Sequence, residues 1–113
     1  MLNKRYRFHS RGGVKYVYRH GKTLRRPDLS LVFCDNERGK TRLAVVVSKK
    51  VNKTAVGRNR IRRRIYEAIR LDFDKFKQPR DYIFVVYNKN LKDIPFPELQ
   101  KTIRSLIEES MLQ

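Results

Sequence analysis

The residues with the clearest chemical potential lie between Ser48 and Arg70, where the chain reads SKKVNKTAVGRNRIRRRIYEAIR. This segment holds nine Lys or Arg residues and a single acid, Glu67. So many like charges repel one another unless an anionic partner neutralises them. A phosphate backbone does so favourably, because each neutralised phosphate releases condensed counterions. The segment therefore predicts contact with a nucleic acid.

From Arg58 onward the same segment has the period of an amphipathic helix. One side carries apolar side chains at i, i+4, i+7 and i+8: Ile61, Ile65, Ala68 and Ile69. At about 100° per residue the opposite side carries polar, cationic and aromatic ones: Asn59, Arg63, Tyr66 and Arg70, flanked by Arg60, Arg62 and Arg64. We predict a helix over residues 57–72 that buries its apolar side and turns its guanidinium groups toward a ligand. The alternative is a basic helix face that contacts only water.

The net charge of the whole chain agrees with this segment. The 113 residues carry a formal net charge of +17. Residues 1–26 hold nine Lys or Arg residues and no acid, whereas residues 81–113 hold four basic and five acidic residues. A surface this positive speeds association with polyanions, so the first two thirds of the chain are expected to face one.

A membrane is the other common polyanion, and the sequence argues against it. Membrane-surface helices carry bulky apolar anchors, whereas this chain has no Trp and a helix stripe of Ile and Ala. No apolar run has the length of a membrane span, and the N-terminus lacks the apolar region of a signal peptide. We expect a cytoplasmic protein.

Side chains suited to catalysis by the protein itself are sparse. Cys34 is the only cysteine and lies in the apolar run LSLVFC, so we expect a buried structural thiol. His9 and His20 are the only histidines, too few for a zinc site, and nothing else supports them as an acid–base pair for RNA cleavage. The neighbouring carboxylates are expected to be solvated: Asp72 with Asp74, and Glu108 with Glu109. We expect no catalytic residue; whether the protein itself binds a metal is unknown.

The predicted elements follow one another in a simple order. They are a helix over 13–20, an extended segment over 23–26, a strand over 29–34, a hairpin turn over 35–40, a strand over 42–48, the basic helix, a strand over 82–87 and a last helix after Pro95 and Pro97. The strand over 42–48 is apolar on both faces, so we expect it to be central. This order predicts an α/β (α+β) two-layer sandwich with three or four strands. Both long helices should cover one side of the sheet. The other side would then be open, or partly covered by the N-terminal segment, and an open face bordered by basic residues would form a groove for single-stranded nucleic acid.

The length allows one RNA-binding domain over residues 1–113. Residues 1–12 are basic and have few apolar anchors. We expect them to form a flexible arm that becomes ordered on RNA.

Taken together, these features resemble the protein subunit of bacterial ribonuclease P, over nearly the whole chain. The strongest motif is Ser48-Lys49-Lys50-Val51, followed by Arg58-Asn59-Arg60-Ile61. Further matches lie in Lys4-Arg5, Arg7, Tyr18-Arg19-His20-Gly21-Lys22 and Asp81-Tyr82. An Arg-Asn-Arg triplet alone would be weak evidence, but its distance from Ser-Lys-Lys, the charge and the order of elements agree.

The resemblance implies a fold and a function. The fold would be a mixed sheet of about four strands in the order α-β-β-β-α-β-α, of the kind found in a ribosomal protein domain, with a left-handed strand–helix–strand crossover that departs from the usual hand. The enzyme would be a ribonucleoprotein that cuts precursor tRNA to form the mature 5′ end. Its chemistry would belong to the RNA subunit and that RNA's Mg²⁺. The protein would act as a monomer on two partners, ribonuclease P RNA and precursor tRNA, with no membrane and no small-molecule substrate.

The resemblance also implies which residues bind. The candidates for contact with the RNA subunit are Lys49, Lys50, Lys53, Arg58, Asn59, Arg60, Arg62, Arg63, Arg64 and Arg70. The candidates for the 5′ leader are Val14, Tyr18, Val32 and Tyr66. Val14 and Val32 stand where the family commonly has aromatic residues, so base stacking should be weaker here, since one stacked base contributes about 1–3 kcal/mol. Tyr66 stands where a basic residue is common, and it either stacks on a nucleotide or caps the edge of the core.

Two other classes of protein share part of this pattern. A ribosomal protein has a similar size, charge and fold, and it would sediment with ribosomal subunits. A free-standing basic ribonuclease would cleave RNA without an RNA partner.

Overall fold

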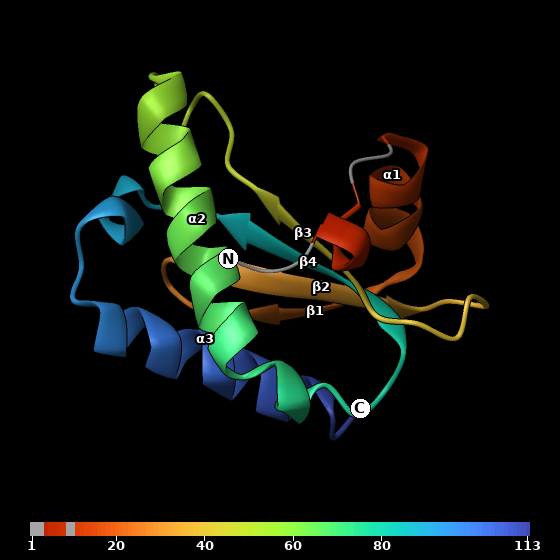
Figure 1. Cartoon of the computed structure of the whole chain (residues 1–113). Helices are drawn as coiled ribbons and strands as arrows, with labels where there is room; N and C mark the ends of the chain where they lie inside the picture. Colours follow the sequence, from red (N-terminus) through yellow and green to blue (C-terminus); the bar gives the residue numbers. More distant parts are fainter. Residues whose placement is uncertain (1–3, 9–10) are drawn as a thin grey trace.

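The fold is built from one sheet and three α-helices, and the computed structural model describes residues 4–8 and 11–113. In chain order the elements are η1 (Lys4–Tyr6), α1 (Arg11–His20), β1 (Lys22–Arg25), β2 (Leu29–Asp35), β3 (Arg42–Val46), α2 (Ala55–Leu71), η2 (Phe73–Lys75), β4 (Arg80–Val86), η3 (Lys89–Lys92) and α3 (Phe96–Ser110). The α-β-β-β-α-β-α order of helices and strands is confirmed (Figure 1). The basic helix begins two residues before the predicted Gly57, because the Thr54 hydroxyl caps it by accepting a hydrogen bond from the Gly57 N–H at 3.0 Å.

The strands lie in the order β1-β2-β4-β3, with β1/β2 and β2/β4 antiparallel and β3/β4 parallel. Two predictions were wrong. Residues 35–40 do not form a hairpin, because β4 lies between the two strands that this turn joins. The strand β3 is at the edge and not central. Its second apolar face packs in part with Phe8. The N-terminal segment holds Phe8 beside β3, because the Phe8 N–H donates to the Leu43 carbonyl at 3.0 Å next to the bridge between Arg7 and Leu43.

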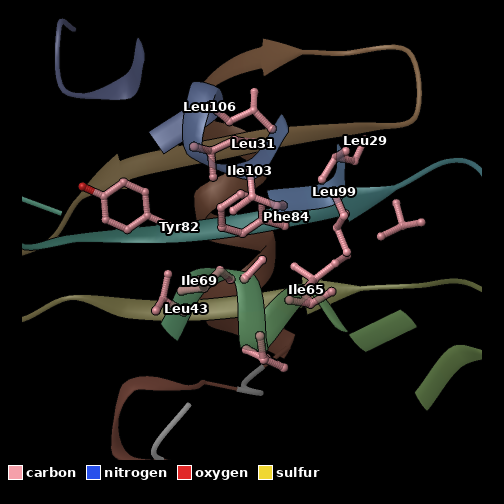
Figure 2. Packing of buried hydrophobic residues seen from close by; sticks show 14 of the residues in the cluster. Leu29, Leu31, Leu43, Ile65, Ile69, Tyr82, Phe84, Leu99, Ile103 and Leu106 are labelled. Carbon is pink, nitrogen blue, oxygen red and sulfur yellow. The ribbon is translucent and has the colours of Figure 1, made fainter. Parts of the chain in front are cut away.

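The main core lies between the sheet and the two long helices. Alternate strand residues such as Leu31, Leu43 and Phe84 point toward α2 and α3, and all three are fully buried (Figure 2). The predicted apolar stripe of α2 is confirmed, since each of its four members is fully buried: Ile61, Ile65, Ala68 and Ile69. Both long helices therefore cover the same side of the sheet, as the sequence predicted.

A second, smaller cluster covers part of the other sheet face. Val17 of α1 packs with Val32 and Ile83 of the sheet and with Phe8. The end of α1 comes very close to β2: a Cβ on Gly21 would lie 2.7 Å from the Phe33 carbonyl oxygen and 2.5 Å from that of Val17. Only glycine permits this approach, so Gly21 fixes α1 on the sheet. The prediction that the N-terminal part of the chain partly covers this face is confirmed.

The N-terminal arm predicted over residues 1–12 falls partly on described residues. Residues 4–8 pack against the body, where the rings of Tyr6 and Phe73 lie 4.6 Å apart and the Arg42 guanidinium lies 4.6 Å from the Phe8 ring. Residues 11 and 12 begin α1. Residues 1–3, 9 and 10 lie outside the described residues, and the order of this segment without RNA stays a prediction.

The buried phenol of Tyr82 gives a prediction on alkaline stability. Its hydroxyl donates to the Gln78 carbonyl at 2.9 Å, and burial raises the pKa of Tyr82 to about 12. An unfolded tyrosine has a pKa of about 10. Because the folded pKa is the higher one, the stabilisation from Tyr82 is complete below pH 10 and is lost as the pH rises toward 12.

We therefore expect the free energy of unfolding to fall between pH 10 and 12. The slope of that free energy against pH reports how many more protons the folded state binds than the unfolded state, and Tyr82→Phe should reduce this number by about one. Urea unfolding of both proteins at several pH values measures the two slopes. Equal slopes would show that Tyr82 is not protected in the folded state.

Candidate nucleic-acid interface

The loop before α2 and the first turns of that helix carry cations that have no acidic partner among the described residues. The side chains of Lys49, Lys50, Lys53 and Arg63 are exposed and make no hydrogen bond or ion pair with any residue that the structure describes. Arg62 donates only to the neutral side-chain oxygen of Asn59. We call Lys49, Lys50, Lys53, Arg62 and Arg63 the cationic ridge. Its charge is uncompensated by the described part of the chain and attracts phosphates.

Three other arginines of α2 use donors within the protein. Arg58 donates to the carbonyls of Asn52 and Lys53 at 3.0 and 3.1 Å, which holds the preceding loop against the helix. Arg60 donates to the Lys92 carbonyl at 3.0 Å. Arg64 donates to the carbonyls of residues 91 and 94 and is half-buried. Burial lowers the pKa of Arg64, with a further contribution from Arg60.

These bonds attach η3 to the helix, so the predicted set of RNA contacts includes residues that also position the backbone. Arg70 is likewise paired, since it donates to Glu67 one turn away, and that hydrogen bond lowers the pKa of the Glu67 carboxyl. The structure thus brings the predicted cations to one helix and its loop. Some of them bond to carbonyl or carboxylate groups of the protein, and the others do not. In the part of the chain that the structure describes, the predicted residues that keep most of their polar groups for a ligand are the cationic ridge and Asn59.

Beside the ridge lies an open cleft of about 680 Å³. Its floor is the outer side of β3, and its walls come from α2, the N-terminal segment and α1. The lining residues are Arg7, Phe8, Val14, Ala44, Val45, Val46, Val56, Asn59, Arg62, Arg63 and Tyr66. The cleft therefore has an apolar floor and a cationic rim, an arrangement that can hold a base and its phosphate together.

Tyr66 does not lie on an open helix face as the helical period indicated. It is only 4% exposed, and the Arg7 guanidinium lies 5.2 Å from its ring centre. The reason is the N-terminal segment, which runs along β3 and covers this part of α2. Burial raises the pKa of the Tyr66 phenol, an effect reduced by the nearby Arg7 charge. Of the two roles considered from the sequence, the geometry favours capping the edge of the core.

The comparison with known proteins decides the family. A sequence model of the family described as Ribonuclease P matches residues 2–110. The chain belongs to the ribonuclease P protein family. The "Ribonuclease P protein component" of Clostridioides difficile is 38% identical over 95 residues, which cover 83% of this chain and 82% of that protein. That of Finegoldia magna is 32% identical over 102 residues, covering 90% and 88%.

Solved structures of the family share the fold. The Staphylococcus aureus RNase P protein superposes with a TM-score of 0.81 at 24% identity, covering 93% of this chain and 94% of that one. The Thermotoga maritima protein gives 0.82 at 21% identity, covering 91% and 96%. Members of the ribonuclease P protein family are subunits of a ribonucleoprotein endoribonuclease that processes tRNA, and this membership implies ribonuclease P RNA as a partner. Among the described residues, no helix is both long and apolar enough to cross a membrane.

Within this ribonuclease P protein the four predicted leader residues are not gathered at one place. Val14 and Tyr66 line the cleft. Val32 is only 6% exposed because α1 covers it, so its side chain has little surface for a base. Tyr18 is 44% exposed, and burial together with the nearby phenol of Tyr87 raises its pKa.

Sequence reasoning missed several residues near these sites. Tyr87 directly follows β4 and is 47% exposed. Side chains two positions apart in a strand point to the same face, so the sequence could have placed Tyr87 on the sheet face of Val85, which α1 partly covers. Arg7 and Phe8 line the cleft, but no local pattern predicts that their segment pairs with β3. Cys34 is half-buried and not fully buried as predicted; burial and the charges of Asp81 and Asp35 raise the pKa of its thiol, so it is a poor nucleophile.

Proposed function

We propose that this ribonuclease P protein binds its catalytic RNA through the cationic ridge and Asn59, and holds the 5′ leader of precursor tRNA along the adjoining cleft. The observation that carries the proposal is the set of cations without described acidic partners next to a hollow with an apolar floor. Each phosphate that the ridge neutralises contributes to affinity through counterion release.

In this function the protein performs no bond chemistry. The cleavage of the precursor belongs to the RNA subunit and its Mg²⁺. Across the described residues, no group of three His, Cys, Asp or Glu side chains is placed to hold a metal ion. The protein contributes positioning, because it neutralises phosphates that would otherwise repel one another where enzyme and substrate RNA meet.

The leader would lie with its bases toward the apolar floor of the cleft and its phosphates toward the cationic rim. The aliphatic side chains of Val14 and Val46 give such a base apolar contact but no ring to stack on. We therefore expect tolerance of leader sequence, since apolar contact does not read hydrogen-bond patterns. One protein monomer supplies both the ridge and the cleft.

Reconstitution tests the function directly. The purified protein should cleave no precursor tRNA by itself, and its addition to ribonuclease P RNA should raise the rate of 5′ cleavage most at low Mg²⁺. The reason is that the ridge and Mg²⁺ both screen phosphate repulsion, so the protein's effect falls as the Mg²⁺ concentration rises.

A protein that cleaves without the RNA would instead be a free-standing ribonuclease. A protein that leaves the RNA-catalysed rate unchanged at every Mg²⁺ concentration would contradict the proposal, and its sedimentation with ribosomal subunits would favour the ribosomal alternative.

A further inference from the structure

The outward side of α1 carries two short parallel rows of side chains. Tyr16 and His20 form one row, with ring centres 4.4 Å apart and planes at 40°. Lys15 and Arg19 form the other, and each row joins residues i and i+4 on neighbouring helical turns. Tyr16 is 56% exposed, and the other three residues are exposed as well. We call these four residues the α1 platform.

The α1 platform is separate from the cleft and from the cationic ridge. Tyr16 and Tyr18 are two positions apart, so at about 100° per residue their side chains diverge by about 160°. Tyr18 points to the sheet side, near Tyr87, and Val17 beside it is fully buried. From α1 the cleft takes Val14 as its lining residue. In Figure 1 α1 stands on the opposite side of the sheet from α3, so the platform faces away from the main core.

The charge around the platform favours an anionic partner. No acid occurs before Asp28 in the sequence. Asp35 and Gln113 line a hollow with His20, but Arg80 pairs with the Asp35 carboxylate at 2.9 Å and donates to the Gln113 carbonyl at 2.7 Å. Neither Lys15 nor Arg19 forms an ion pair with a residue that the structure describes. Contact between the rings explains why Tyr16 and His20 lie together. It does not explain why two cations with no acidic partner among the described residues lie beside exposed rings.

The helix that carries the platform is also fixed on the sheet. The Gly21 N–H donates to the Val17 carbonyl at 2.7 Å, and the close approach of Gly21 to Phe33 fixes this end of the helix on β2. A ligand that binds here finds the helix backbone already ordered, which lowers the entropic cost of binding.

From this geometry we infer that the α1 platform is a second binding site for single-stranded RNA, in which one base stacks on Tyr16 and the neighbouring phosphates contact Lys15 and Arg19. Stacking on an exposed ring needs an unpaired base, and paired RNA keeps its bases within the helix. The strand has two possible sources with the same chemistry: the part of the leader distal to the cleft, or an unpaired stretch of the RNA subunit.

Fluorescence polarisation with a labelled, unstructured oligouridine tests the site. Tyr16→Ala should weaken binding at least about fivefold, the lower limit for one lost stack, whereas Tyr16→Phe should bind as the unaltered protein does. Lys15→Ala with Arg19→Ala should flatten the dependence of log affinity on log salt by about 1.4, for two phosphate contacts on a single strand. The Tyr16→Ala loss should recur when Arg62 and Arg63 are also replaced by alanine, because the sites are separate.

Tyr16→Leu is the control for a purely structural role, since it keeps apolar contact with His20 but has no ring. Circular dichroism and thermal unfolding establish that each variant is folded. Should Tyr16→Leu bind the oligonucleotide as tightly as the unaltered protein, or should Tyr16→Ala bind unchanged, the platform is not a stacking site.

The source of the strand is found by repeating the Tyr16→Ala measurement with natural RNAs. A loss confined to precursor tRNA with a long leader, and absent with a short one, assigns the platform to the leader. A loss with the RNA subunit alone assigns it to that RNA. A loss with neither would overturn the inference, and this result is independent of the reconstitution assay, which tests the ridge and the cleft.

Discussion

Replacing Arg62 and Arg63 together with alanine is expected to lower the affinity for ribonuclease P RNA at least tenfold. A hydrogen bond to a charged group contributes about 1.5–3 kcal/mol, so even one lost phosphate contact has this effect. Two lost contacts should also flatten the dependence of log affinity on log salt by about 1.4 to 1.8. Filter binding over a range of salt concentrations measures both quantities.

The fold should survive this double replacement. Neither side chain belongs to the buried stripe of α2, and neither makes a bond to another element among the described residues. Arg58, Arg60 and Arg64 are less suitable targets, because their removal also releases the loop before α2 or η3. A loss of affinity in those variants would mix RNA contact with backbone disorder.

The matched control removes the same charge from another part of the surface. Lys77 and Lys101 are exposed and lie before β4 and on α3, away from the ridge. Lys77→Ala with Lys101→Ala should leave the salt slope nearly unchanged. If both double variants lose affinity equally, binding depends on net charge alone and the ridge is not the contact surface.

Local sequence patterns predicted most of the elements because their causes are local. The period of α2 follows from four buried apolar residues on one stripe, and the strands follow from alternation. Pairing of strands is not local. The composition of residues 35–40 shows that the chain turns, but it does not show that β4 will later insert between β2 and β3. For the same reason the local pattern predicts a central β3, whereas its second apolar face packs partly against Phe8 and α1 and partly lines the cleft.

The candidate site shows the same division between local and distant causes. The sequence placed the cations on one helix and its loop, and the structure has them there. The sequence could not show which guanidinium groups donate hydrogen bonds to carbonyls of distant segments. Arg64, for example, donates to the carbonyl of Leu91, which is 27 residues away. Tyr66 was placed on the outward face by its helical angle, yet Arg7 from the N-terminal segment lies over its ring. Both differences depend on tertiary contacts that a helical period does not encode.

Ile65→Ala is expected to lower the free energy of unfolding by about 2–5 kcal/mol. Ile65 lies on α2 with no exposed surface and packs in the main core between the sheet and α3 (Figure 2). Truncation removes buried methyl and methylene groups and leaves a cavity that the close-packed neighbours fill only partly. Equilibrium unfolding in urea, with circular dichroism as the signal, measures the difference.

The control on the same helix is Val56→Ala, because Val56 is 76% exposed. Its effect on the free energy of unfolding should stay within about 0.5 kcal/mol, as for other surface substitutions. Ile65→Ala also separates the two faces of α2. Where the variant is still folded, its affinity for ribonuclease P RNA and its salt slope should match those of the unaltered protein, since the cation side of the helix is unchanged. An unchanged free energy of unfolding would show that α2 buries a different face, and in that case the ridge could not point to RNA as described.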